Sequence, residues 1–149
     1  MKIMGKRKYC KGVSLIEVLV AVIILAFGLL GLAGLQSVSL RNNNSAMMRT
    51  QATYLAQDII DRMRVNKTAA IDDMSYEQSM ATATPTVAVN SPLDVIDRNA
   101  WLTSIENTLP SGDGEIDCVD ATDVCEITIQ WNDRRDLNNL QQFITSTQL

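Results

Sequence analysis

Glu17 is a lone carboxylate at the start of an apolar run, and it needs a positively charged partner. The run from Val18 to Leu35 consists of 18 consecutive aliphatic, aromatic or glycine residues. An ionised carboxylate at the edge of a membrane helix costs about 2–4 kcal/mol when nothing neutralises it. Cleavage of the chain after Gly12 would create a new α-amino group on Val13, and Glu17 could pair with that cation. These three residues therefore predict peptide cleavage followed by charge pairing.

The residues before the apolar run are basic, whereas the rest of the chain is acidic. Residues 1–12 contain five Lys or Arg and no Asp or Glu. Without them the chain has eight basic and 17 acidic side chains, a formal charge of −9. This asymmetry predicts that the leader stays in the cytoplasm and that the remainder is exported. An acidic chain is not expected to bind nucleic acid, so no direct nucleic-acid partner is predicted.

The segment 13–35 is long enough to cross a bilayer. Its 23 residues would span ~34 Å as a helix. No small-residue cleavage site follows it, which argues against an ordinary secretory signal. Cys10 follows Lys8 and Tyr9 rather than an apolar stretch, which argues against a lipoprotein. We expect a single membrane-spanning helix in the inner membrane, with its N-terminus in the cytoplasm.

The helical pattern continues beyond the apolar run. No proline occurs in the range 13–66, and apolar residues after Leu40 recur at steps of three and four. We therefore predict one helix over 13–66, about 75–80 Å long. Its first half is apolar on every side, and its second half has one apolar stripe. The stripe residues are Met48, Ala52, Leu55, Ile59 and Met63.

Residues 67–149 are predicted to form a small periplasmic α+β domain. Ser91 is the expected N-cap of a helix over 92–109, with Pro92 at its first position. The run Ser111–Gly114 has turn chemistry. The predicted fold class is α+β: a long N-terminal helix packed against a small antiparallel sheet, with one additional helix. Alternating and β-branched residues predict strands at about 115–119, 124–132 and 141–148.

The two cysteines of this domain are predicted to form a disulfide. If 115–119 and 124–132 pair as a hairpin, Cys118 lies directly opposite Cys125, which is suitable geometry for a cross-strand bond. A redox-active pair is more usually Cys-x-x-Cys, so we expect a structural bond. Such a bond is typical of an oxidising compartment such as the periplasm.

Composition argues against catalysis. The chain has no histidine, which removes the commonest general base and metal ligand, and no nucleophile has a recognisable base. No catalytic residues, cofactor or metal site are expected. Six carboxylates lie close together in the hairpin, and they favour a solvated acidic face, with a calcium site as the alternative. They are Asp113, Glu115, Asp117, Asp120, Asp123 and Glu126.

The N-terminal residues 12–21, Gly-Val-Ser-Leu-Ile-Glu-Val-Leu-Val-Ala, resemble the class III signal of type IV prepilins and pseudopilins. The segment Leu25–Gln36 is more specifically similar to minor pilins of the type IV pilus modification protein PilV family. Three segments of the C-terminal half also resemble that family. They are Trp101-Leu102, Leu109–Gly114 and Ile127–Asp133.

The resemblance implies roles for the signal residues. The membrane-embedded prepilin peptidase would cleave between Gly12 and Val13, and Val13 would become the N-methylated first residue. Family members more often have Phe at that position. Val13 departs from this pattern, and the departure concerns the efficiency of N-methylation rather than cleavage. Glu17 would neutralise the N-terminal amine of a neighbouring subunit during assembly. Three glycines, Gly28, Gly31 and Gly34, indicate either close helix packing or the partial unwinding known in pilin helices.

The resemblance also implies a structural function. The chain would be a minor pilin that primes or joins pilus assembly, supporting twitching motility, adhesion or DNA uptake, first in the inner membrane and then in the extracellular pilus. Its partners would be prepilin peptidase, other minor pilins and the major pilin through the N-terminal helix, and a tip adhesin. The nearest alternative is a minor pseudopilin of a type II secretion system. A membrane-anchored periplasmic enzyme and a ligand-binding module are the remaining alternatives.

Overall fold

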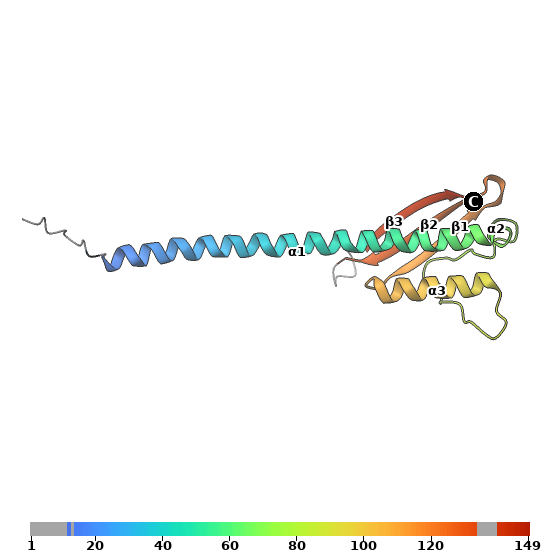
Figure 1. The fold of residues 1–149 in the computed structure, drawn as a ribbon, viewed down its shortest axis with the longest axis horizontal. Coiled ribbons are helices and arrows are strands. Elements are labelled where there is room, and N and C mark those ends of the chain that lie inside the picture. The colour runs from blue at the N-terminus through green and yellow to red at the C-terminus, as the bar shows by residue number, and fades with distance from the viewer. Residues whose placement is uncertain (1–11, 13, 134–139) are drawn as a thin grey trace, which may run out of the picture. The chain divides into compact units, whose positions relative to one another are not determined.

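The computed structural model describes residues 12, 14–133 and 140–149. The chain divides into two units, Met1–Asn42 and Asn43–Leu149, which we call unit 1 and unit 2 and describe separately. Helix α1, Leu15–Val65, contributes residues to both units (Figure 1). All other helices and strands belong to unit 2.

In unit 1, α1 begins directly after Ser14. The carbonyl of Ser14 accepts hydrogen bonds from the backbone N–H groups of Glu17 and Val18 at 3.0 and 3.3 Å. Every residue of α1 within this unit is exposed, including Phe27, whose exposed fraction is 71%. The helix contains a segment long and apolar enough to cross a membrane. A large apolar side chain left in water forgoes about 1.5–3 kcal/mol, so burial in lipid or against other helices would stabilise this surface.

The three glycines of unit 1 lie within the continuous helix. Apart from the helix's own nearby backbone, no described atom lies within 4 Å of the position that a Cβ would take at Gly28, Gly31 or Gly34. A neighbouring helix could therefore approach closely on that side, as the packing interpretation requires. The helix is wound through all three positions. Both interpretations of these glycines stay open.

In unit 2, the predicted stripe of α1 is buried. Met48, Ala52, Ile59 and Met63 are all 5% exposed or less, and Leu55 is half-buried. They share the core with the apolar face of α3, Leu93–Thr108, whose Trp101 is completely buried. The indole N–H of Trp101 donates to the carbonyl of Leu55 at 2.9 Å, which fixes α3 against α1.

The sheet of unit 2 has three antiparallel strands in the order β1-β2-β3. They are β1 Asp113–Val119, β2 Val124–Asn132 and β3 Leu140–Gln148. A 3₁₀ turn, Asp120–Thr122, joins β1 to β2, and a short helix α2, Lys67–Ile71, follows α1. The predicted α+β class is confirmed: a long N-terminal helix, one further helix and a small antiparallel sheet.

The helices lie on one face of the sheet. Arg49 and Arg64 of α1 donate to the side chains of Gln141 and Thr147 of β3, so β3 runs in the same direction as this part of α1. A Cβ placed on Gly114 of β1 would meet Trp101 of α3 at 2.5 Å. The core side chains of the sheet point towards these helices, whereas on its other face Asp117, Glu126 and Ile144 are exposed and Thr128 is buried. The inward side chains include Ile116, Cys118, Cys125, Ile127, Ile129 and Trp131.

Two local predictions were wrong. Ser91 is not the N-cap of α3: Pro92 takes that position, and the Ser91 hydroxyl instead accepts a hydrogen bond from the N–H of Ala88. The turn before β1 also ends earlier than predicted. Ser111 carries the positive φ of 51°, whereas Gly114 already lies in β1. Gly114 is glycine because the indole of Trp101 occupies the space of a side chain.

Candidate functional site

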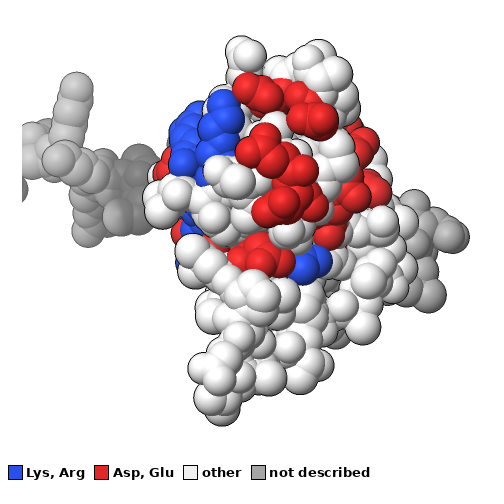
Figure 2. Space-filling model, turned by 90° about the vertical axis from the view of Figure 1, so that its right-hand side faces the viewer, with Lys and Arg blue, Asp and Glu red and all other residues white. Residues whose placement is uncertain are grey.

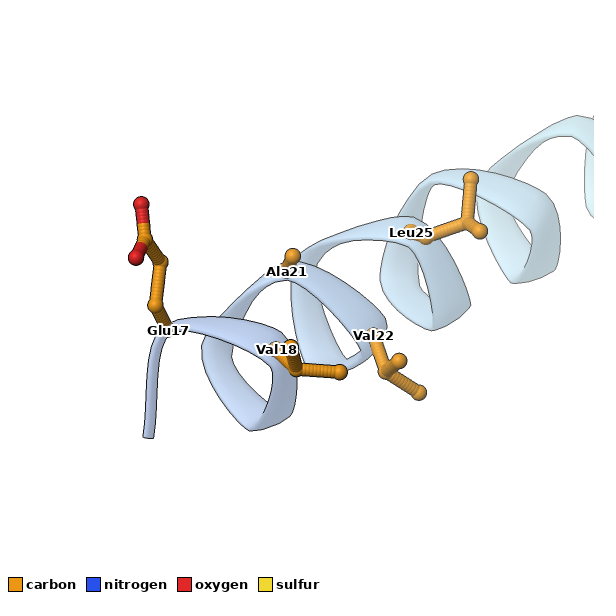
Figure 3. A pocket seen from close by; sticks show the side chains of 5 residues that line it. All are labelled: Glu17, Val18, Ala21, Val22 and Leu25. Carbon is orange, nitrogen blue, oxygen red and sulfur yellow. The ribbon is translucent and has the colours of Figure 1, made fainter. Parts of the chain in front are cut away.

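The carboxylate of Glu17 is exposed in the first turn of α1. Figure 3 shows it extending outward from the helix; Glu17 lines a shallow hollow together with Val18, Ala21, Val22 and Leu25. Among the described residues, no Lys or Arg nitrogen lies within 4.0 Å of this carboxylate. The helix N-terminus favours a negative charge at this position, but only by about 0.3–1 kcal/mol. Glu17 is therefore positioned to accept a cation from elsewhere.

The proposed cleavage junction is only partly described. Gly12 is exposed and has no helical structure, so its backbone is accessible. Val13 and the leader 1–11 lie outside the described residues. Cleavage at Gly12–Val13, N-methylation of Val13 and the assembly role of Glu17 therefore stay predictions.

A buried polar network joins three segments of unit 2. The carboxylate of Asp97 in α3 accepts hydrogen bonds from the hydroxyl of Tyr76 at 2.6 Å and from Nη1 of Arg62 at 3.1 Å. Arg62 also donates to Asp58 at 3.0 Å. Partial burial lowers the pKa of Arg62, but its hydrogen bonds and charge interactions with both carboxylates outweigh this and raise the pKa above its usual value. Asn66 completes the network with a long contact of 3.5 Å to the Tyr76 oxygen.

Tyr76 anchors the segment between α2 and α3. Its side chain is completely buried, and burial together with the hydrogen bond to Asp97 raises the pKa of its hydroxyl to about 12. The sequence around Asp97 does not indicate a buried carboxylate, because helical periodicity places such a residue on the solvent side by default. Arg62 four residues after Asp58 was the only local signal. The network joins α1, the segment after α2 and α3 through hydrogen bonds within the chain, which indicates a structural role.

A second arginine strengthens the same region. The guanidinium of Arg98 donates to the carboxylate of Asp94 at 3.3 Å and to the backbone carbonyl of Glu77 at 3.1 Å. Asp94 is only 8% exposed. The loop that follows Tyr76 is thereby attached to α3 as well as to α1. This arrangement stabilises unit 2 and contributes no reactive group.

The structure contains the disulfide between Cys118 and Cys125. The two residues lie directly opposite each other in the β1–β2 ladder, and both are buried. The bond closes the hairpin whose turn contains Asp123 in a left-handed conformation, with φ of 52°. Its buried position against the core is that of a structural cross-link.

The acidic residues of the hairpin do not converge on one point. Figure 2 shows acidic side chains gathered on the end of unit 2 at which α2 lies. Within the described part of the chain, no three Asp, Glu or Cys side chains are placed so that they could hold a metal ion. Asp113 instead accepts from the backbone of Ala81 at 2.6 Å, and Asp123 pairs with Lys67 at 3.1 Å. The geometry gives no support to the calcium alternative.

Comparison with known proteins gives one match, which covers the N-terminal part of the chain. Residues 7–33 match the family model of the prokaryotic N-terminal methylation motif. This segment contains Gly12, Val13 and Glu17 and the first turns of α1, and over it the chain is type IV prepilin-like. The match includes no residue of unit 2. No curated protein and no solved structure matches the chain.

Proposed function

We propose that this protein is a minor type IV pilin, a structural subunit that primes or joins pilus assembly. The observation that carries the proposal is the methylation motif over residues 7–33, at the start of a helix whose apolar residues in unit 1 are all exposed. Such a surface is stable only in lipid or against other helices, and a filament subunit occupies both environments in turn. The resemblance of Leu25–Gln36 and of the C-terminal segments to PilV-type proteins supports the minor role.

Assembly would begin with processing. Prepilin peptidase would cleave after Gly12, and the new α-amino group of Val13 would be methylated. In lipid, where charges are weakly screened, Glu17 of one subunit would then attract the N-terminal cation of its neighbour. This attraction sets the register between helices that are otherwise uniformly apolar.

The location follows from the same features. The basic leader would hold the N-terminus in the cytoplasm, and α1 would anchor the chain in the inner membrane. Unit 2 would lie in the periplasm, where an oxidising environment is compatible with the Cys118–Cys125 bond. Incorporation would carry the subunit, with other minor pilins, the major pilin and a tip adhesin, into the extracellular pilus.

The second candidate is a minor pseudopilin of a type II secretion system, because the methylation motif is common to both classes. Deletion of the gene distinguishes them when surface pili are imaged by electron microscopy and secretion is assayed in the same strain. We expect pili, and with them twitching, adhesion or DNA uptake, to be lost while secretion is intact. Loss of secretion with normal pili would assign the chain to the secretion system.

A further inference from the structure

Arg41, in unit 1, differs from the other described cations because its side chain has no partner within the described residues. Its side chain is exposed, and it forms no hydrogen bond or ion pair with residues 12, 14–133 or 140–149. Every other Lys or Arg that the structure describes donates a hydrogen bond to another residue. These are Arg49, Arg62, Arg64, Lys67 and Arg98. The five N–H donors of the Arg41 guanidinium are therefore available to an anion outside the chain.

The sequence around Arg41 offers no carboxylate that could pair with it along the helix. Side chains on a helix meet when they are three or four residues apart. The nearest acidic residues in the sequence are Glu17, 24 positions earlier, and Asp58, 17 positions later. Between these two residues the only charged side chains are Arg41 and Arg49. An anionic partner of Arg41 must therefore come from another molecule.

Arg41 follows the apolar run at the distance expected of a lipid headgroup. The run 18–35 would span ~27 Å as a helix, close to the ~30 Å thickness of the hydrocarbon core. Glu17 and Gln36 bound this run and so limit how far it can shift across the bilayer. Arg41 lies six residues beyond Leu35, about 9 Å further along the helix. Because each headgroup layer is about 5–8 Å thick, the backbone of Arg41 would lie at its outer boundary.

The direction of the Arg41 side chain would bring its guanidinium back into the headgroup layer. In an α-helix the Cα–Cβ bonds tilt towards the N-terminus, which for Arg41 is the side of the apolar run. Long basic side chains near the ends of membrane helices extend along the helix until the charged group reaches the polar interface. The methylene groups of Arg41 would then cover Val38, one turn earlier, which is 54% exposed. The guanidinium would lie among the lipid phosphates.

We propose that Arg41 binds the phosphate group of a membrane phospholipid. A guanidinium binds phosphate oxygens through two parallel N–H···O hydrogen bonds, which fix its position better than a single point charge does. This contact holds the helix at one depth, at the end of the membrane-spanning segment opposite Glu17. The proposal rests on the proposed insertion of α1 into the membrane. It goes beyond that insertion by assigning a ligand to a residue that the pairing of Glu17 does not use.

The test measures how close arginine lies to lipid phosphorus. The full chain, with its arginine guanidinium carbons labelled with carbon-13, is inserted into bilayers of phosphatidylethanolamine and phosphatidylglycerol in phosphate-free buffer. Solid-state NMR then measures the dipolar coupling between these carbons and phosphorus. Arg7→Lys in the same chain removes the arginine of the basic leader, which could contact lipid by itself. We expect a guanidinium carbon within about 5 Å of phosphorus, as two parallel hydrogen bonds require.

Two variants of this labelled chain identify the arginine responsible. Arg41→Gln removes the proposed ligand contact, so the carbon–phosphorus coupling should fall by at least about tenfold. Arg49→Gln is the matched control on the same helix. The guanidinium of Arg49 donates to Gln141 at 3.1 Å within unit 2, so its loss should leave the coupling unchanged.

Flotation of the vesicles after an alkaline wash measures membrane insertion separately from phosphate binding. A chain that floats with the vesicles but shows no coupling to phosphorus would overturn the proposal and leave the insertion of α1 intact. Coupling that persists in Arg41→Gln, or that disappears equally in Arg49→Gln, would also overturn it, because another arginine would then supply the contact. A chain that does not float would overturn the insertion of α1 and this proposal with it.

Discussion

The hydroxyl of Tyr76 donates a 2.6 Å hydrogen bond to the carboxylate of Asp97, and neither residue is more than 6% exposed. The same carboxylate accepts from Arg62 at 3.1 Å. Asp97→Ala leaves a buried hydroxyl and a guanidinium without this partner, so we expect the free energy of unfolding to fall by about 2–4 kcal/mol. This free energy can be measured by denaturant unfolding of the chain in micelles. Tryptophan fluorescence reports the unfolding, because both tryptophans, Trp101 and Trp131, are buried in unit 2.

The matched control for this variant is Asp61→Ala. Asp61 also pairs with an arginine of α1, Arg64, at 3.0 Å, but both side chains are about half exposed. Exposed ion pairs contribute about 0–1 kcal/mol, so the free energy of unfolding should change little in this variant. Equal decreases in the free energy of unfolding for the two variants would show that the Tyr76–Asp97–Arg62 network stabilises the fold no more than an exposed ion pair does.

Stability should fall at high pH because of Tyr76. The pKa of this hydroxyl is raised to about 12 in the folded chain, from an unfolded value of about 10. The unfolded chain therefore loses its proton first, and the contribution to stability is complete below pH ~10 and lost as the pH rises towards ~12. The expected loss is on the order of 1–3 kcal/mol.

The measurement is the difference between the chain and its Tyr76→Phe variant across this range. Phe cannot ionise, so the variant removes this contribution and leaves the titration of lysines and of the exposed Tyr54 in both proteins. The two stabilities should converge as the pH rises through 10–12. Parallel curves would show that Tyr76 titrates normally.

Periodicity predicted most of the fold. Steps of three and four in α1 identified Met48, Ala52, Ile59 and Met63 as core residues, because a buried helix face needs that spacing whatever it packs against. Alternation in the hairpin placed Cys118 opposite Cys125, since a strand has a period of two and the short turn leaves few registers.

Features that depend on packing between distant segments could not be predicted. Asp97 is buried because Arg62 and Tyr76 reach it from other segments, and no local pattern indicates that partnership. Gly114 resembled a turn glycine, yet its function is to admit the ring of Trp101. The candidate site residues at 12–17 could be proposed from the sequence for the opposite reason: the chemistry predicted for them depends on neighbours within a few positions of the chain.

Gly114→Ala should destabilise unit 2. The added Cβ would lie 2.5 Å from Trp101 and 2.8 Å from Ile105, and both side chains are completely buried and cannot move freely. Overpacking of this kind costs about 1–3 kcal/mol. Tryptophan-monitored unfolding should show the loss. Gly31→Ala is the control, because nothing lies within 4 Å of its new methyl group, and it should leave unfolding of unit 2 unchanged.

Loss of the disulfide should lower stability without abolishing the fold. A cross-link between Cys118 and Cys125 closes a short loop, for which the chain-entropy model gives about 2–3 kcal/mol. The double variant Cys118→Ala/Cys125→Ala should show that decrease with or without reductant. In the unmodified chain, reductant alone should produce it. Cys10→Ala should have no effect, and a similar loss in that variant would contradict a structural role for the buried bond.

Glu17→Ala should separate processing from assembly. Cleavage depends on the junction at Gly12, so mass spectrometry should find the mature chain beginning at Val13, whereas Gly12→Leu should leave residues 1–12 attached. Without the carboxylate, the N-terminal cation of a neighbour has no partner in lipid, and incorporation into isolated pili should fall by at least about tenfold. Glu17→Asp is the conservative control and should restore part of the incorporation. Glu17→Ala subunits present in pili at the normal level would refute the pairing between Glu17 and the processed N-terminus.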